Sequence, residues 1–470
     1  VSRSVAAAVL ATSMLSVSSI ALATNGYFTH GVGAQSKGMA GTGIGSNADM
    51  GAIITASNPA LGVFAGDNWE AGLSLFSPRR SYEASSASSG GALLEIQPGV
   101  FFPSHSIASG EIDSSSEWFP IPYVAKNWSL EGDRNISMAF YGRGGMNTDW
   151  DDSDASATSY LCGGDPSVPE PPASGRGPFC AGAAGVDLSQ AFLSVNYSAK
   201  VGDNFAWGIG PVFGMQAFEA TGVQTFQVIS ETLAETGDFA QVDSLSNNGH
   251  ESSTGFGLAL GVWWGISDTV SFGVGYQSKI SMSELDDYAD LFAEDGGFDI
   301  PSSLKAGISF MANDALRVNV DVEHTRFSEV ASVGNPMVNM FGCPLLPFGG
   351  SDTESCLGGD SGAGFGWDDM TTYKLGFEWQ QDSNNVWRFG YSHGEQPIQA
   401  ADVLFNILAP GVMEDHFTVG WTRNRDNGDQ FTLSIMFAPE NDITGPSLFD
   451  PAQTINLSMS QFEFEVAYRF

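Results

Sequence analysis

Apolar and polar side chains alternate strictly along the last nine residues of the chain. The apolar positions in this stretch are Phe462, Phe464, Val466, Tyr468 and Phe470. A period of two places all of them on one face and predicts a β-strand with an apolar surface. A terminal strand of this kind with an aromatic last residue is typical of bacterial outer-membrane β-barrels, and we expect Phe470 to be the assembly signal that the barrel-assembly machinery reads.

The same alternation recurs after Gly66 and predicts about 14 strands, typically ten or more residues long. Their expected starts lie near Trp69, Trp118, Ile136, Leu188, Phe205, Phe256, Val270, Leu304, Leu316, Tyr373, Val386, Phe417, Phe431 and Phe462. A strand that crosses a bilayer needs about 9–11 residues, whereas the strands of soluble sandwiches are usually shorter. We therefore expect an all-β fold, a 14-stranded antiparallel transmembrane β-barrel.

The predicted connections between these strands alternate in length. The long ones span residues 78–116, 147–186, 227–250, 285–299, 329–368, 395–414 and 439–459. The short ones span residues 129–134, 202–204, 267–268, 313–314, 382–384 and 425–428. Because outer-membrane barrels have short periplasmic turns and long extracellular loops, both chain ends are expected on the periplasmic side.

The composition excludes nucleic acid as a partner. The chain has 18 basic and 54 acidic residues, a formal net charge of −36, yet only 15% of its residues are charged. Such a charge repels nucleic acid and anionic surfaces. With 57 glycines and 12% aromatic residues, the composition fits a barrel better than a disordered acidic chain.

The first 66 residues lack the barrel pattern. Arg3, an apolar run over residues 5–15 and Ala21-Leu22-Ala23 predict a secretory signal peptide over residues 1–23, with a first transmembrane helix as the alternative. No later segment has about 18 consecutive apolar residues. Residues 24–66 are expected to form a hatch inside the lumen, or else a periplasmic tail, and residues 67–470 the barrel.

Four cysteines lie in two of the long loops. In an exported chain they predict disulfides, and proximity favours Cys162–Cys180 and Cys343–Cys356 among the three possible connectivities. Zinc is a weak alternative because neither pair has CxxC spacing and no histidine lies near.

Several sequence blocks resemble the long-chain fatty-acid transporter family of outer membranes (FadL-type). The N-terminal block, Thr24-Asn25-Gly26-Tyr27-Phe28 with the Gly-rich residues 31–41, is similar to the aromatic-hydrocarbon (toluene-transporter-like) branch. Asn58-Pro59-Ala60 is similar to the family's hatch motif, and residues 141–149 are similar to the end of its third strand. With the order of elements and Phe470, the resemblance covers nearly all of the chain after residue 23.

This resemblance implies a barrel plugged by an N-terminal hatch. It implies capture of hydrophobic molecules at the extracellular loops and lateral exit through a wall gap at a kink in the third strand, without ATP or an ion gradient. The loops depart from the family in their cysteine pairs, their acidic residues and the Pro-rich stretch within residues 147–186. Because loops choose ligands, the resemblance does not decide between fatty acids, alkanes and monoaromatics.

Two groups of residues are candidates for the transport path. Gly142, Gly144 and Gly145 lie where the third strand should continue, and they mark either a lateral-opening kink or the start of a loop. Apolar residues at helical spacing in two long loops predict two short helices that form a ligand groove or pack only on each other. They are Ile229, Leu233, Phe239, Leu285, Tyr288 and Phe292.

Lysines in the lumen are candidate partners for a ligand carboxylate. The alternation points Lys279, Lys305 and Lys374 inward, where a carboxylate in a low-dielectric channel would need a cation. The alternative is that they pair with luminal acids such as Asp321 and Glu378.

The function predicted from these observations is passive outer-membrane uptake of hydrophobic molecules. The alternatives are a channel dedicated to monoaromatic hydrocarbons, a general diffusion porin and a barrel phospholipase. The histidines are scattered and none shows HExxH spacing, so no enzyme, cofactor or metal is expected, although the acidic run at residues 149–154 leaves Ca²⁺ binding open. The expected partners are the hydrophobic ligand, outer-membrane lipid and lipopolysaccharide, and the barrel is expected to be a monomer.

Overall fold

The computed structural model describes residues 25–151, 153–160, 162 and 172–470. The predicted signal peptide, residues 1–23, lies outside the described residues, as does Asp152 of the acidic run. None of the helices in the described ranges is long and apolar enough to cross a membrane.

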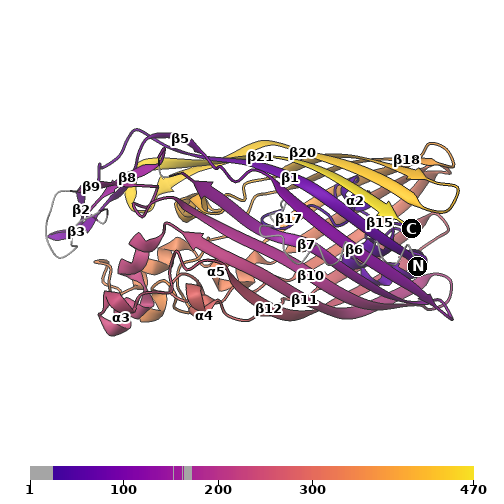
Figure 1. Ribbon diagram of the computed structural model, residues 1–470, viewed down its shortest axis with the longest axis horizontal. Helices are drawn as coiled ribbons and strands as arrows, with labels where there is room; N and C mark the ends of the chain where they lie inside the picture. Colours follow the sequence, from indigo (N-terminus) through magenta and orange to yellow (C-terminus); the bar gives the residue numbers. More distant parts are fainter. Residues whose placement is uncertain (1–24, 152, 161, 163–171) are drawn as a thin grey trace.

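Fourteen antiparallel strands of the described chain close into a barrel (Figure 1). They are β1 (Asn68–Ala84), β6 (Phe119–Leu130), β7 (Arg134–Trp150), β10 (Ala184–Lys200), β11 (Phe205–Thr221), β12 (Glu251–Gly265), β13 (Val270–Gln277), β15 (Ser303–Asn313), β16 (Leu316–Thr325), β17 (Met370–Gln380), β18 (Asn385–Gly394), β19 (Asp415–Asn424), β20 (Gln430–Ser447) and β21 (Asp450–Arg469). Each strand pairs with the barrel strands next to it in the chain, and β1 closes the ring on β21 with Leu75 opposite Phe464. The predicted barrel is therefore confirmed.

The apolar side chains of the alternating pattern point outward from the barrel, and the polar ones point into the lumen. On β21, Phe462 is 41% exposed, whereas the inward Glu463 and Glu465 are only 2% and 1% exposed. On β1, Leu73 and Leu75 are likewise exposed, while Glu70 and Ser74 are buried. A barrel that presents its large apolar side chains outward and buries its carboxylates is built for a lipid surround.

The two ends of the barrel differ, as Figure 1 shows. At one end the strands are joined by tight turns at residues 131–133, 201–204, 266–269, 314–315, 381–384 and 425–429. Trp69 and Phe470 exchange backbone hydrogen bonds of 2.8 and 2.9 Å between the first and last strands. At the other end, six long connections span residues 85–118, 151–183, 222–250, 278–302, 326–369 and 395–414.

One expected long connection is wrong. Residues 439–459 do not form a loop, because β20 and β21 continue as a paired hairpin through Pro446 opposite Thr454. β1 likewise continues to Ala84, six residues beyond the predicted loop start at residue 78. These strand ends lie near the loop end of the barrel, where the outward face need not be apolar, so the alternation that predicts a strand is weaker there.

The long connections carry short elements that pack over the loop end. They include the hairpin of β2 (Leu93–Gln97) and β3 (Val100–Pro103), the small sheet of β4 (His105–Ile107), β8 (Ser156–Ser159) and β9 (Ala173–Arg176), β5 (Gly110–Asp113) beside β1, and β14 (Ser281–Met282) beside β12. The short helices are α3 (Glu231–Thr236), α4 (Ala293–Gly296), α5 (Ala331–Gly334), η4 (Gln224–Ile229), η5 (Phe239–Gln241), η6 (Asp286–Tyr288), η7 (Phe327–Glu329), η8 (Met337–Gly342), η9 (Thr353–Ser355), η10 (Ala400–Asp402) and η11 (Phe405–Ile407). Both predicted disulfides, Cys162–Cys180 and Cys343–Cys356, are present.

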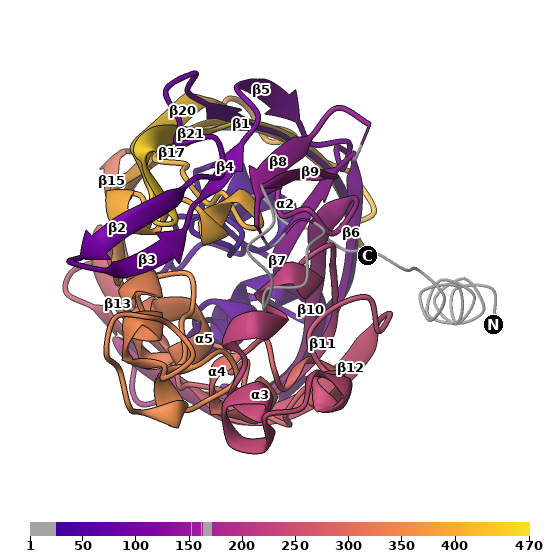
Figure 2. The ribbon, with the colours of Figure 1, turned by 90° about the vertical axis from the view of Figure 1, so that its left-hand side faces the viewer.

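Residues 25–66 form no barrel strand and lie inside the ring of strands, as the end-on view of Figure 2 shows. We call them the luminal segment. It contains α2 (Ala34–Lys37), η2 (Ala52–Ala56) and η3 (Pro59–Phe64), and most of its residues are buried.

Candidate functional site

Charged and polar contacts hold the luminal segment against the barrel wall. Lys37 Nζ contacts Glu463 and lies 2.7 Å from Glu465 Oε2, and all three side chains are buried. Opposite this triad, the backbone N–H groups of Gly43 and Ile44 donate to Asp321 Oδ2 at 2.7 and 3.0 Å. The segment is therefore pinned to both β16 and β21.

Asn58-Pro59-Ala60 forms the turn that opens η3. Asn58 Oδ1 accepts from Ala60 N at 3.0 Å, while its Nδ2 donates to Ile44 O at 3.0 Å and to Val262 O at 3.2 Å. Pro59 suits the first position of a helix because its missing N–H has no partner there. The wall is adapted to this turn: a Cβ at Gly261 of β12 would lie 2.1 Å from Asn58 Oδ1.

The start of the luminal segment hydrogen-bonds to β7. Gly145 N donates to Tyr27 O at 3.0 Å, and Thr29 N donates to Arg143 O at 2.9 Å, so that Phe28 lies opposite Gly144. Asn25 and Phe28 form a tight turn with each other, and Gly26 has a positive φ of 64°. Residues 27–29 therefore act as a short extra strand on the edge of β7.

The barrel wall is incomplete beside this contact. β6 pairs with β7 only from Leu130 opposite Arg134 to Tyr123 opposite Tyr141, whereas β10 pairs with β7 as far as Trp150. Among the described residues, the part of β7 from Gly142 upward thus has partners on its β6 side only in residues 27–29 and in the loop at residues 114–116. We call this part the free edge of β7.

A bulge lies at the same place. Gly142 is opposite Ala191 and Gly144 is opposite Gln190, which leaves Arg143 as the extra residue. β7 continues to Trp150, so the glycines do not start a loop. A bulge bends a strand and interrupts its ladder, which fits the predicted kink at Gly142, Gly144 and Gly145.

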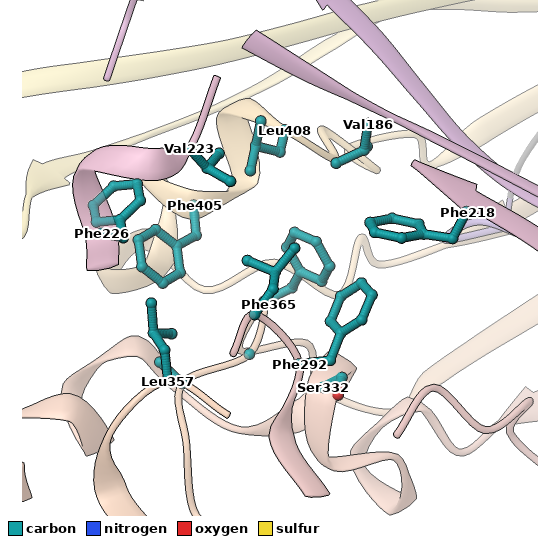
Figure 3. A pocket seen from close by; sticks show the side chains of 13 residues that line it. Val186, Phe218, Val223, Phe226, Phe292, Ser332, Leu357, Phe365, Phe405 and Leu408 are labelled. Carbon is teal, nitrogen blue, oxygen red and sulfur yellow. The ribbon is translucent and has the colours of Figure 1, made fainter. Parts of the chain in front are cut away.

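An apolar chamber lies under the loops (Figure 3). We call it the inner cavity. Aromatic rings from the wall and from four loops converge on it, and Ser332 is the one polar side chain among its lining residues. The lining residues are Val186, Phe218, Val223, Phe226, Leu291, Phe292, Ser332, Leu357, Ala363, Gly364, Phe365, Phe405 and Leu408, around about 480 Å³ of empty space that includes some open to solvent.

A second apolar depression, the outer groove, lies on the loop surface. It is formed by Phe102, Pro103, Val228, Leu233, Gly237, Phe239, Leu345, Leu346 and Pro347. Phe239 is 46% exposed and Leu345 is 37% exposed. Large exposed apolar side chains gathered in one groove mark a binding surface for apolar molecules.

A third space, the gap cavity, adjoins the free edge of β7. Its lining residues are Gly26, Tyr27, Arg80, Gly145, Met146, Asn147, Trp367, Ala409, Pro410, Gly411 and Met459, around about 250 Å³ of empty space that includes some open to solvent. It lies next to the inner cavity, because Trp367 is 6.4 Å from Phe365 between ring centroids and Ala409 follows Leu408 in the chain. Phe226 of the inner cavity and Val228 of the outer groove both belong to η4, so the three spaces follow one another from the loop surface to the free edge of β7.

The predicted groove residues are divided among these spaces. Leu233 and Phe239 line the outer groove and Phe292 lines the inner cavity. Ile229, Leu285 and Tyr288 are buried within the packed loops and line neither space.

The helices expected from the spacing of these residues are only partly present. Residues 286–288 make one 3₁₀ turn, and α3 covers Glu231–Thr236. The apolar spacing reflects burial by several neighbouring loops, which does not require one continuous helix.

The three lysines predicted to bind a ligand carboxylate already form ion pairs with acidic side chains of the protein. Lys305 Nζ and Lys374 Nζ lie 3.1 and 2.7 Å from the two oxygens of Glu323. Lys279 lies 2.7 Å from Asp299 Oδ2 and is partly exposed. The luminal acid that satisfies Lys305 and Lys374 is thus Glu323, which the sequence interpretation did not name.

An acidic cluster lies between the outer groove and the inner cavity. Burial, together with Glu354, Asp295, Glu235 and Asp360, raises the pKa of Glu231 to about 7. Glu231 N donates to Leu357 O at 2.8 Å and Leu357 N donates to Ile229 O at 2.9 Å, so these residues join two loops.

A closed barrel with an outward apolar face and a lumen occupied by its own N-terminal segment is the architecture of an outer-membrane protein. The chain belongs to the outer membrane protein transport protein family (OMPP1/FadL/TodX), whose sequence model matches residues 178–427. This confirms the resemblance to the FadL-type family through residues outside the N-terminal block, and the family is one of outer-membrane transport proteins. No curated protein matches the chain in sequence.

Solved structures share the fold over nearly the whole chain. The toluene transporter TodX of Pseudomonas putida is 16% identical, with 94% of this chain and 98% of that chain covered and a TM-score of 0.59. The toluene transporter TbuX of Ralstonia pickettii is also 16% identical, with 94% and 98% covered and a TM-score of 0.56. A Pseudomonas aeruginosa FadL homologue is 13% identical, with 95% and 99% covered and a TM-score of 0.57.

Proposed function

We propose that the protein takes up hydrophobic molecules passively. Ligand is captured in the outer groove, passes to the inner cavity and leaves sideways past the free edge of β7 after residues 27–29 move. The observation that carries this proposal is that residues 27–29, rather than β6, cover the free edge of β7 beside an apolar cavity. A cover that belongs to the luminal segment can move without breaking the barrel ladder.

The luminal segment is, on this proposal, the hatch of the channel. Its aromatic start lies against the loops: Tyr27 is 5.3 Å from Phe327 and 5.8 Å from Trp367 between ring centroids. A shift of these rings would open the gap cavity toward the inner cavity. Asn58, Pro59 and Ala60 hold the other end of the hatch to the wall.

Lateral exit suits apolar cargo because of its hydration cost. A ligand with roughly 200 Å² of apolar surface is about 5 kcal/mol less stable in water than in an apolar medium. Release into lipid avoids that cost, whereas release into the periplasm does not. We further propose that outer-membrane lipid and lipopolysaccharide surround the wall, and that the exposed terminal Phe470 is read by the assembly machinery.

Two alternatives remain distinguishable. A channel dedicated to monoaromatics is supported by the carbon-lined inner cavity and by the fold shared with the toluene transporters TodX and TbuX. A diffusion porin would need a continuous polar path, and the buried luminal segment argues against one. Swelling of protein-loaded liposomes in sugars would reveal a porin.

The proposed route is tested by filling the gap. The double variant Gly144→Trp with Gly145→Trp should abolish uptake of radiolabelled toluene or dodecanoate by expressing cells while the purified protein still binds ligand. Even a Cβ at Gly144 would lie 2.0 Å from Gln190 Oε1 and 3.3 Å from Phe28 Cε1, so indole rings fill the space. Leu73→Trp, on the lipid face of β1, is the matched control. Unchanged uptake in the double variant would exclude the lateral route.

A further inference from the structure

Two fully buried histidines lie face to face where the luminal segment meets the barrel wall. His30 belongs to the luminal segment and His416 to β19, and each is 0% exposed. Their rings are stacked, with centroids 5.9 Å apart and an angle of 17° between the ring planes. The pair therefore joins the two parts of the molecule that have to separate if the luminal segment moves.

The surroundings of His416 offer little support for a positive charge. Its Nδ1 lies 3.4 Å from Ser392 Oγ, and its Nε2 has no hydrogen-bond partner among the described residues. The neighbouring Asp415 is engaged elsewhere, because Tyr391 Oη donates to its Oδ1 at 2.6 Å and His393 Nδ1 lies 3.0 Å from the same oxygen. A buried charge without a partner is costly, so His416 is best accommodated in its neutral form.

His30 is flanked by two cations and by one carboxylate. Lys374 Nζ donates to its backbone oxygen at 2.8 Å, and its ring Nε2 lies 3.4 Å from Lys37 O. Its Nδ1 lies 3.4 Å from Glu463 Oε2, but the same carboxylate already contacts Lys37 Nζ. One proton on His30 can be accommodated there, and a second proton on the pair cannot.

The other acidic side chains on the strands around the pair already contact donors. The ion pairs are Glu465 with Lys37, Glu323 with Lys305 and Lys374, and Glu378 with Arg388. Asp321 accepts from two backbone N–H groups of the luminal segment. The charges around the two histidines are thus arranged for neutral rings.

We propose that the His30–His416 pair is a proton-sensitive latch, so that acid releases the luminal segment and opens the channel. This inference rests on the proposed role of that segment as a hatch and names its regulation. With both rings protonated in the closed state, two positive charges would face each other across 5.9 Å, with Lys37 and Lys374 beside them. Displacement of the segment separates the two charges and lets water hydrate them.

The direction of the pH effect follows from proton binding. A histidine in water has a pKa of about 6.5, so both rings take up protons readily once they are hydrated. The closed state binds fewer protons than the displaced state, and a fall in pH therefore favours displacement. The latch should hold at neutral pH and release as the pH falls through about 6.

The test is the conductance of the purified full-length protein in planar bilayers between about pH 7.5 and about pH 5. Wild-type conductance should rise roughly tenfold or more across this range as the pH falls, and more steeply than in proportion to proton concentration, because two rings take up protons. His416→Phe keeps a ring against His30 but binds no proton, so this variant should stay closed throughout. His416→Asn gives the same readout should the larger change impair folding or closure.

Two control variants remove titratable groups outside the latch. His324→Gln is the matched histidine control, because His324 is partly exposed and lies against Thr371 of the wall rather than against the luminal segment. Glu231→Gln removes a loop carboxylate whose pKa is raised to about 7. Both variants should keep the wild-type response to acid.

The outcomes separate this inference from the proposed function. If wild type stays closed at about pH 5 while a variant without the Lys37 cation conducts at neutral pH, the hatch stands and the proton latch is wrong. A wild-type response to acid that persists in both His416 variants would also overturn the latch. If neither acid nor loss of Lys37 opens the barrel, the hatch role fails and the latch with it. Heat-modifiable migration in electrophoresis confirms that each variant is a folded barrel.

Discussion

Removing Lys37 should release the luminal segment while leaving the barrel intact. Lys37 is 5% exposed and bridges Glu463 and Glu465, which are 2% and 1% exposed. Lys37→Met keeps the length and apolar stem of the side chain but leaves two buried carboxylates without their cation. Breaking a buried ion pair by removing one partner costs about 3–5 kcal/mol.

This free-energy cost should displace the luminal segment rather than unfold the barrel wall. The carboxylates belong to β21, whose ladders with β1 and β20 do not involve Lys37. If residues 25–66 shift, water can reach Glu463 and Glu465 and hydrate their charges, so this movement relieves the cost. A penalty of this size changes the ratio of plugged to open channels by roughly two to three and a half orders of magnitude. His30, with Nδ1 3.4 Å from Glu463 Oε2, limits the effect if it becomes protonated.

The assay is conductance in planar bilayers together with liposome swelling in small sugars. Lys37→Met should conduct ions and admit sugars, while wild type stays closed. The triple variant with Glu463→Gln and Glu465→Gln removes the uncompensated charges and should return toward the closed state. A folded Lys37→Met barrel that is as impermeable to ions and sugars as wild type would show that the ion triad does not hold the luminal segment in place.

Three further results are expected. Asn58→Ala removes the hydrogen bonds to Ala60, Ile44 and Val262, each of about 1 kcal/mol, and should raise sugar leakage less than Lys37→Met does; leakage equal to wild type would contradict the anchoring role. Breaking Cys343–Cys356 with serines should destabilise its loop by roughly 3 kcal/mol and speed its proteolysis, whereas unchanged proteolysis would mean that packing alone orders it. Because the pKa of Glu231 is raised to about 7, the folded loops bind a proton that the unfolded chain releases above pH 4.5, so loop stability should fall as pH rises from 4.5 through 7. Hydrogen exchange at residues 229–237, corrected for the intrinsic rate, should show this fall in wild type and lose it in Glu231→Gln; equal pH dependence in both would refute it.

Alternation along the chain was sufficient to predict the barrel. It placed Glu463 and Glu465 inward and Phe462 outward, because a strand in a lipid-facing wall must present apolar side chains on one face. The prediction failed at the loop ends of some strands, where apolar and polar residues no longer alternate. Arg79 and Arg80 follow Pro78 without alternation, so the sequence interpretation assigned them to a loop, and the buried Arg80 was missed.

The site residues depend on contacts that local sequence does not encode. Lys305 was expected inward, but its pairing follows from the register that places it opposite Glu323. Phe226, Phe365 and Phe405 come from three different loops, and only their folding together forms the inner cavity. A usable signal was present at residues 403–409, where six of seven side chains are apolar and only Asn406 is polar, which is unusual for a loop.

The most direct test of the account is a reversible crosslink between Phe28 and Gly144. These residues are opposite each other, flanked by the hydrogen bonds of Tyr27 with Gly145 and of Thr29 with Arg143. A pair flanked in this way has Cα atoms about 4.5 Å apart, within the range of a disulfide. The double variant Phe28→Cys with Gly144→Cys should therefore lock residues 27–29 onto β7 when oxidised.

The measurement is uptake of radiolabelled ligand by cells that express the crosslinked protein, before and after mild reduction. Uptake should be near background while the crosslink is oxidised and should recover on reduction. Each single variant and wild type, whose native disulfides experience the same treatment, should be unaffected. Full uptake through the oxidised, crosslinked barrel would contradict the claim that cargo leaves past the free edge of β7.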